Sequence, residues 1–112
     1  MIVNKKKKAI LAKKYKICKS FLSKTIGLIF SLKPKTLLFI WQKEKIRNIH
    51  MILVFFPIDV LWLDRNKKVI DMRKRFMPFL ITNTSKPAKY IIELPEGTIK
   101  KTKTEKEDLI KF

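Results

Sequence analysis

The chain has 112 residues, and its 27 lysines and arginines against 9 aspartates and glutamates give a formal net charge of +18 at pH 7. A domain of this length buries roughly two-thirds of the surface that its unfolded chain exposes, so the chain supports one core and a multidomain enzyme is excluded. The apolar fraction of 46% is typical of a folded protein and excludes an intrinsically disordered one.

The first half of the chain carries most of the positive charge. Residues 1–48 contain 13 lysines and Arg47 but a single acid, Glu44, so they hold +13 of the +18. We expect residues 1–14 to form a basic extension, whose flexibility the sequence leaves open, and residues 15–112 to form one β-rich domain. A positive field attracts polyanions. The candidate residues for nonspecific RNA or DNA binding are Lys5, Lys6, Lys7, Lys8, Lys13 and Lys14.

An explanation of the same lysines that involves no binding function stays open. Composition bias of the genome or growth at high temperature also enriches a chain in lysine. The chain has 23 lysines but only 4 arginines, and arginine is the residue that bidentate phosphate recognition prefers. The charge therefore suits nonspecific phosphate contacts and does not by itself identify a partner.

One helix and one strand are predicted in the first half. Ser20 is a suitable N-cap, and the apolar residues that follow it have helical spacing, which predicts a short helix over residues 20–30. Pro34 ends this pattern because proline cannot continue a helix. Residues 36–41 are rich in β formers and predict a buried strand.

A strand-like stretch occupies the centre of the chain on both sides of Pro57. Residues 49–56 are apolar, and residues 58–63 carry apolar side chains on both faces, which is typical of a strand inside the fold. Turn residues follow, with Asn66 expected to take a positive φ, and residues 68–72 return as the second strand of a hairpin.

The last third of the chain predicts three further strands. Residues 89–94 form one strand, and a turn over residues 95–97 follows it. Residues 98–101 and 109–112 are expected to form short closing strands.

The sequence shows neither an export signal nor a membrane-spanning run. The longest apolar stretch, residues 51–63, is interrupted by Pro57 and Asp59 and is shorter than the roughly 20 residues that a spanning helix needs. A single cysteine, Cys18, excludes a disulfide framework. We therefore expect a cytoplasmic protein of one domain, with an oligomeric state that the sequence leaves open.

Few residues are available for catalysis or for a cofactor. The chain has two glycines, seventy positions apart, which excludes the glycine-rich loops that cradle nucleotide phosphates. One histidine and one cysteine cannot build a zinc cage, so we expect no metal and no cofactor. Cys18, His50 and Asp59 are the residue types of a nucleophilic triad, but three such residues occur in most sequences. A small enzyme that uses Asp59 and His50 stays open as an alternative.

Asp59 is the acid with the most unusual surroundings. It stands between Ile58 and Val60 in an apolar run, and burial of a carboxylate without a partner costs several kcal/mol. Either Asp59 accepts hydrogen bonds from backbone N–H groups or a basic side chain, or it lines a ligand cleft. Glu93, beside Leu94 in the predicted strand 89–94, raises the same question more weakly.

Four blocks of the sequence resemble one uncharacterised prokaryotic family, domain of unknown function 192, also called uncharacterised protein family 0127. The blocks are Gly27-Leu28-Ile29-Phe30, then His50-Met51, then Phe56-Pro57-Ile58-Asp59-Val60 with Leu63-Asp64, and last Tyr90-Ile91-Ile92-Glu93-Leu94-Pro95-Glu96-Gly97. Two positions depart from the family pattern. Ile29 replaces a methionine, and Glu107 replaces the glycine before Asp108, which puts the tight turn expected there in doubt.

The resemblance implies a mainly β (α+β) fold, a small and partly open barrel-like sheet with one short helix near residues 20–30. It implies no activity. It does place His50, Met51, Asp59 and Glu93 in matching blocks, so these four residues are the candidate pocket. We expect a non-catalytic module that binds a ligand or macromolecule at a cleft near Asp59 and His50, with nonspecific nucleic-acid binding as the alternative.

Overall fold

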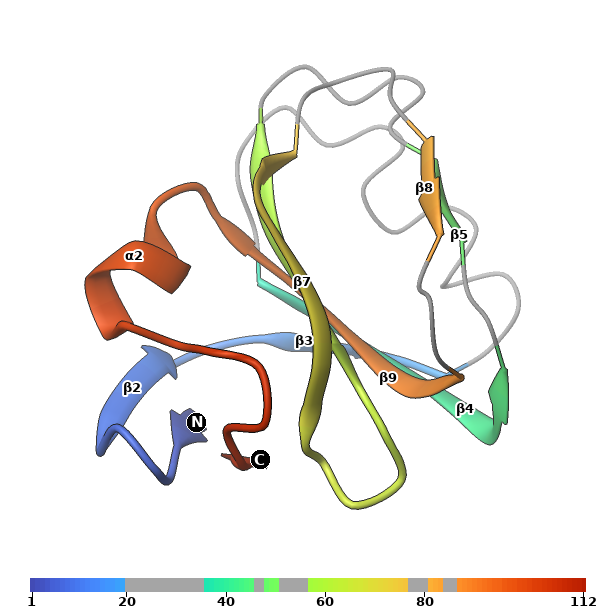
Figure 1. The fold of residues 1–112 in the computed structure, drawn as a ribbon, viewed down its shortest axis with the longest axis horizontal. Helices are drawn as coiled ribbons and strands as arrows, with labels where there is room; N and C mark the ends of the chain where they lie inside the picture. Colours follow the sequence, from blue (N-terminus) through green and yellow to red (C-terminus); the bar gives the residue numbers. More distant parts are fainter. Residues whose placement is uncertain (20–35, 46–47, 51–56, 77–80, 84–86) are drawn as a thin grey trace.

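The computed structural model describes residues 1–19, 36–45, 48–50, 57–76, 81–83 and 87–112. The described residues are mostly β, as the sequence predicted, and their ten strands run through the chain from end to end (Figure 1). The helix predicted over residues 20–30 lies outside the described residues, as does most of the predicted strand 49–56.

A five-stranded sheet forms the centre of the molecule. Its strand order is β3-β4-β9-β6-β7, and neighbouring strands are antiparallel except for the parallel pair β3 and β4. The edges of this sheet, β3 and β7, do not pair with each other, so the described strands leave the barrel open. The strands are β3 (Lys16–Cys18), β4 (Leu37–Lys45), β6 (Ile58–Leu63), β7 (Val69–Phe76) and β9 (Ala88–Pro95).

The remaining strands lie on opposite sides of this sheet. A three-stranded sheet, in the order β10-β1-β2, joins the two ends of the chain and lies beside the helix α2 (Figure 1). A separate pair, β5 and β8, lies on the other side. These elements are β1 (Ile2–Asn4), β2 (Ala9–Ala12), β5 (Asn48–His50), β8 (Ile81–Asn83), α2 (Thr98–Thr102) and β10 (Ile110–Lys111).

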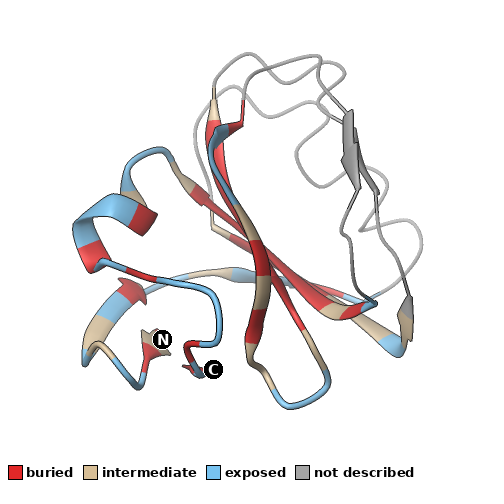
Figure 2. Cartoon of the chain, viewed as in Figure 1, coloured by how far each residue is buried: buried red, intermediate tan, exposed pale blue. Residues whose placement is uncertain are grey.

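Strand β6 is buried along its whole length because β9 and β7 cover both of its edges and apolar layers cover both faces. Among the described strands, β6 and β9 are accordingly the most continuously buried (Figure 2). This confirms the prediction that residues 58–63 form an interior strand, and the antiparallel pair β6 and β7 confirms the predicted hairpin.

The five-stranded sheet has two faces with separate cores, which we name after one residue each. The Trp62 face carries the buried residues Cys18, Leu37, Phe39, Ile58, Val60, Trp62, Phe76, Ala88 and Ile91. The Leu61 face carries Leu38, Leu61, Leu63, Val69, Tyr90, Ile92 and Leu94, together with Ile2, Leu11, Ile99 and Ile110 from the elements that cover it. The three-stranded sheet and α2 therefore close the core on the Leu61 face.

The segment over residues 1–14, for which the sequence indicated a basic extension, contains β1 and β2. Ile2 and Asn4 are fully buried, and β1 pairs with β10 near the other end of the chain. The Asn4 amide donates to Asp108 Oδ2 at 2.9 Å and to Thr104 Oγ1 at 3.1 Å. This segment is therefore packed against the C-terminal residues.

The closing strand predicted over residues 98–101 is wrong, because these residues form α2. Gly97 precedes the helix with a φ of 92°, a left-handed conformation that suits glycine. Ile99 and Thr102, three positions apart, are the buried residues of the helix. Four residues rich in β-branched side chains are too few for periodicity to separate a strand from one helical turn.

Two left-handed turns also differ from the sequence-based expectation. In the β6–β7 hairpin Lys67, with a φ of 63°, takes the positive φ that Asn66 was predicted to take. Asp64 explains this, since its Oδ1 accepts the backbone N–H groups of Asn66 and Lys68 and sets the turn. Glu107 has a φ of 77°, so the tight turn that was in doubt forms without glycine.

Candidate functional site

The Asp59 carboxylate is buried and bonded to backbone N–H groups on both of its oxygens. Oδ1 accepts from Arg75 N at 2.9 Å, and Oδ2 accepts from Ile99 N at 2.8 Å. The side chain joins β6 to the end of β7 and to the first turn of α2. Of the two roles that the sequence left open for Asp59, this geometry favours the structural one.

The sheet separates Asp59 from Glu93. In the β6–β9 pairing Asp59 lies opposite Leu94, whereas Glu93 lies opposite Val60. Opposed residues share a face and successive residues alternate, so Asp59 points to the Leu61 face and Glu93 to the Trp62 face. The structure therefore does not bring these two members of the candidate pocket together.

The other two members of the candidate pocket are only partly described. The backbone of His50 ends β5, where it pairs with Ile81 of β8. Met51 lies outside the described residues.

Glu93 is buried in the Trp62 face without a partner for one of its oxygens. It is 5% exposed, and its Oε2 accepts no hydrogen bond from any described residue. Burial raises the pKa of this carboxyl to about 8, and no charge among the described residues contributes to the shift. Glu93 therefore carries a proton at neutral pH, and its carboxyl group both donates and accepts hydrogen bonds.

Trp62 carries a second polar atom without a partner on the same face. Its side chain is fully buried, and its Nε1–H donates to none of the described residues. Trp62 lies opposite Ile91 in the β6–β9 ladder, and Ile91 and Glu93 point the same way. Glu93 and Trp62 are thus diagonal neighbours, for which Cα atoms lie about 7–8 Å apart.

The sequence pointed to Glu93 but missed Trp62. Trp62 belongs to the predicted interior strand 58–63, and its full burial agrees with that prediction. Whether the indole N–H of Trp62 finds an acceptor depends on the groups that face β6 on this side of the sheet. The sequence carries no local signal for them. The paired feature, Glu93 with Trp62, therefore becomes visible only once the register of β6 and β9 is known.

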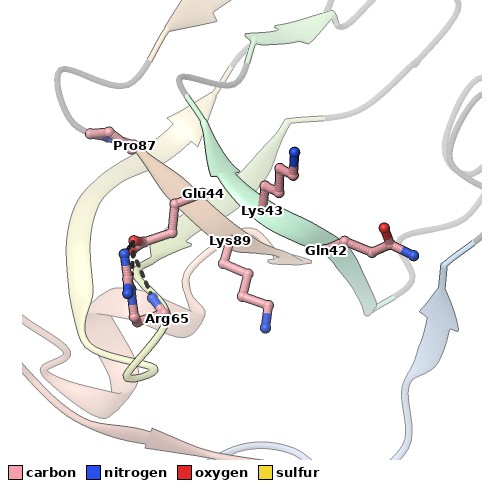
Figure 3. A pocket seen from close by; sticks show the side chains of 6 residues that line it. All are labelled: Gln42, Lys43, Glu44, Arg65, Pro87 and Lys89. Carbon is pink, nitrogen blue, oxygen red and sulfur yellow. Dashed lines mark hydrogen bonds and ion pairs between the residues drawn. The ribbon is translucent and has the colours of Figure 1, made fainter.

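An open depression of about 560 Å³ lies where β4 ends and β9 begins, next to the turn of the β6–β7 hairpin. Glu44 Oε1 lies 2.8 Å from both Nε and Nη2 of Arg65, and Glu44 Oε2 accepts the Arg65 backbone N–H at 2.9 Å (Figure 3). These bonds lower the pKa of Glu44. Gln42, Lys43, Pro87 and Lys89 complete the lining.

This depression is a weaker candidate than the Glu93 and Trp62 pair. The side chains of Gln42, Lys43 and Lys89 extend in different directions and do not converge on one point (Figure 3). The charges of Glu44 and Arg65 are already paired with each other. The arrangement fixes the hairpin turn against β4, and it offers a ligand scattered positive charge in contact with solvent.

The candidate polyanion-binding lysines lie around β1 and β2. Lys5, Lys6 and Lys8 are exposed in the turn between these strands, and Lys13 and Lys14 are exposed after β2. Lys7 differs from them, since its Nζ lies 3.4 Å from Glu105 and 3.7 Å from Asp108. Burial favours a higher pKa of Asp108. Hydrogen bonds from Asn4 and from the Glu105 backbone, together with the charges of Lys7 and Lys6, outweigh burial and lower this pKa.

Comparisons with known proteins agree with the resemblance in the sequence. A family model, "DUF192: Uncharacterized ACR, COG1430", matches residues 1–112. A UPF0127 protein of Thermococcus kodakarensis is 34% identical over 115 residues, a match that spans all of this chain and 73% of that protein. A UPF0127 protein of Pyrococcus horikoshii is 35% identical over 114 residues and is covered to 98%.

Two solved structures share the fold. One, from Sinorhizobium meliloti and described as a candidate transcription regulator, superposes with a TM-score of 0.80 at 19% identity, covering 87% of this chain and 79% of that one. The other, a protein of unknown function from Novosphingobium aromaticivorans, gives a TM-score of 0.81 at 13% identity and covers 88% and 74%. Within the described part of the chain, no helix has the length and apolar character needed to cross a bilayer.

Proposed function

We propose, for a chain that belongs to the uncharacterised family DUF192, a function without catalysis: it is a small binding module whose ligand lies on the Trp62 face, against Glu93 and Trp62. The observation that carries this proposal is the pair of buried polar atoms, Glu93 Oε2 and Trp62 Nε1, that lack partners among the described residues. More than nine in ten buried polar groups of native proteins are paired, so two orphans on one face indicate an absent partner.

The same face argues for binding rather than for catalysis. General acid–base chemistry uses two groups whose environments push their pKa values apart. Burial raises the pKa of Glu93, and no second titratable group within the described part of the chain acts on it. Its neighbours across the ladder, Leu37 and Val60, are apolar. Asp59 supports the fold from the opposite face, and we assign it no contact with the ligand.

The test uses the Trp62 indole N–H as a reporter in ¹H–¹⁵N NMR spectra, with Trp41→Phe to assign the two indole signals. We expect fragments with an apolar ring and one polar group to shift the Trp62 signal, and Glu93→Ala to weaken their binding at least tenfold. Tyr90→Phe is the matched control, because Tyr90 is buried on the Leu61 face. If no fragment shifts the Trp62 signal and only water exchanges with it, the proposal is wrong.

The exposed lysines favour a second candidate function, nonspecific binding of RNA or DNA. Besides Lys5, Lys6 and Lys8, the helix α2 exposes Lys100 and Lys101, and it lies beside β2 (Figure 1). One of the two similar folds is described as a candidate transcription regulator, which is compatible with this function.

We also propose a reducing, cytoplasmic setting, which the single and buried Cys18 supports.

A salt titration tests this second function. If the turn lysines contact phosphates, replacing Lys5, Lys6 and Lys8 by serine makes the negative slope of log K against log salt shallower by roughly 2–3, since each lost phosphate contact changes it by about 0.9. Replacing Lys43, Lys74 and Lys89 removes the same charge elsewhere and is expected to change the slope less. Equal effects of the two triple variants, or no binding at low salt, exclude a binding surface at the β1–β2 turn.

A further inference from the structure

We infer that the ligand of the Glu93 and Trp62 site is an uncharged molecule with an apolar body and a carboxamide group, or a group that likewise donates and accepts hydrogen bonds. This inference rests on the proposed function, because it names the chemistry of the ligand at that same site. Free amides and the peptide groups of a bound chain share this chemistry.

The polar groups of the site select for it. A protonated carboxyl offers one donor and one acceptor, and the Trp62 indole offers one further donor. A carboxamide matches the carboxyl of Glu93 with two reciprocal hydrogen bonds, and its carbonyl oxygen has a second lone pair for a further donor. Among the described residues no charged group acts on Glu93, so an anionic ligand would meet no cation from them.

The apolar lining selects against a charged ligand of either sign. Leu37 and Val60 lie opposite Glu93 on the neighbouring strands, Ile91 lies opposite Trp62, and all three are at most 2% exposed. A cationic ligand would have to ionise Glu93 and then bury both charges in this environment, where desolvation opposes the ion pair. A neutral ligand keeps the proton on Glu93 and avoids that penalty.

The test compares benzamide with benzylammonium, two probes of similar shape that differ in charge. We measure both affinities at pH 7 by the Trp62 indole signal and the proton exchange by calorimetry in two buffers of different ionisation enthalpy. Benzamide is expected to bind at least tenfold more tightly and without release of a proton. Glu93→Gln retains a donor and an acceptor, so benzamide affinity should change less than about threefold in this variant.

The pH dependence gives a second readout. Benzamide affinity should fall above about pH 8 in the wild type, as Glu93 loses its proton, and stay constant in Glu93→Gln. Tighter or equal binding of benzylammonium with release of a proton overturns the inference but leaves the proposed function standing. If neither probe shifts the Trp62 signal, the inference fails, and the wider fragment set decides the proposed function.

Discussion

Replacement of Asp59 by alanine is expected to lower the free energy of unfolding by roughly 3–5 kcal/mol, because it leaves two backbone N–H groups without acceptors. These are the N–H groups of Arg75 and Ile99, which the carboxylate accepts at 2.9 and 2.8 Å. The Ile99 bond is buried, so water cannot replace it without disturbing the first turn of α2. Urea denaturation at pH 7, with the midpoint and slope fitted together, measures the change.

Asp59→Asn distinguishes the structural role from a role in ligand binding. The carbonyl oxygen of the asparagine side chain accepts from one of the two N–H groups, but its NH₂ faces the other. We therefore expect the free energy of unfolding to fall, by less than in Asp59→Ala. Asp64→Asn is the matched control. Asp64 also accepts two backbone N–H groups, but in an exposed turn that asparagine supports equally well. A stable Asp59→Asn with impaired ligand binding would contradict the structural role and move the site to the Leu61 face.

The strands that could be predicted from the sequence are those whose signal is local. Residues 58–63 are apolar at nearly every position, which is sufficient to indicate an interior strand, and β6 is buried throughout. Turn residues after Leu63 were sufficient for the hairpin with β7. The helical turn α2 could not be predicted, because its five residues cover little more than one helical period and Gly97 acts only through its backbone conformation.

The candidate site depends on information that no local pattern contains. Asp59 and Glu93 both look like buried acids in apolar strands, and the family resemblance grouped them in one candidate pocket because both stand in its matching blocks. The pairing of Val60 with Glu93 decides that they face opposite sides, and these residues are 33 positions apart. A shift of one residue in that register would have put the two carboxyls on one face. The register thus separates a structural acid from a candidate ligand contact.

The unpartnered carboxyl of Glu93 opposes folding, and a purely structural residue at this position would have a partner or be apolar. Burial holds the pKa of Glu93 at about 8 in the folded protein, against 4.5 as its usual value. The unfolded chain therefore gives up this proton at a lower pH than the folded protein does. The contribution of Glu93 to the free energy of unfolding is fully present below pH 4.5, falls as the pH rises from there to about 8, and levels off above that value.

Glu93→Gln should remove this pH dependence, because glutamine stays uncharged in both states. We expect the free energy of unfolding of the variant, relative to that of the wild type, to rise by roughly 3–5 kcal/mol between pH 5 and pH 8.5. This range follows because each pH unit between the two pKa values of Glu93 changes the difference by about 1.4 kcal/mol. Denaturant titrations of both proteins across this range measure it. Glu44→Gln is the control of opposite sign, since hydrogen bonds from Arg65 lower the pKa of Glu44 and its contribution is lost as the pH falls. Parallel stability curves for the wild type and Glu93→Gln would show that a partner already satisfies Glu93, and the site would lose its reason to bind a ligand.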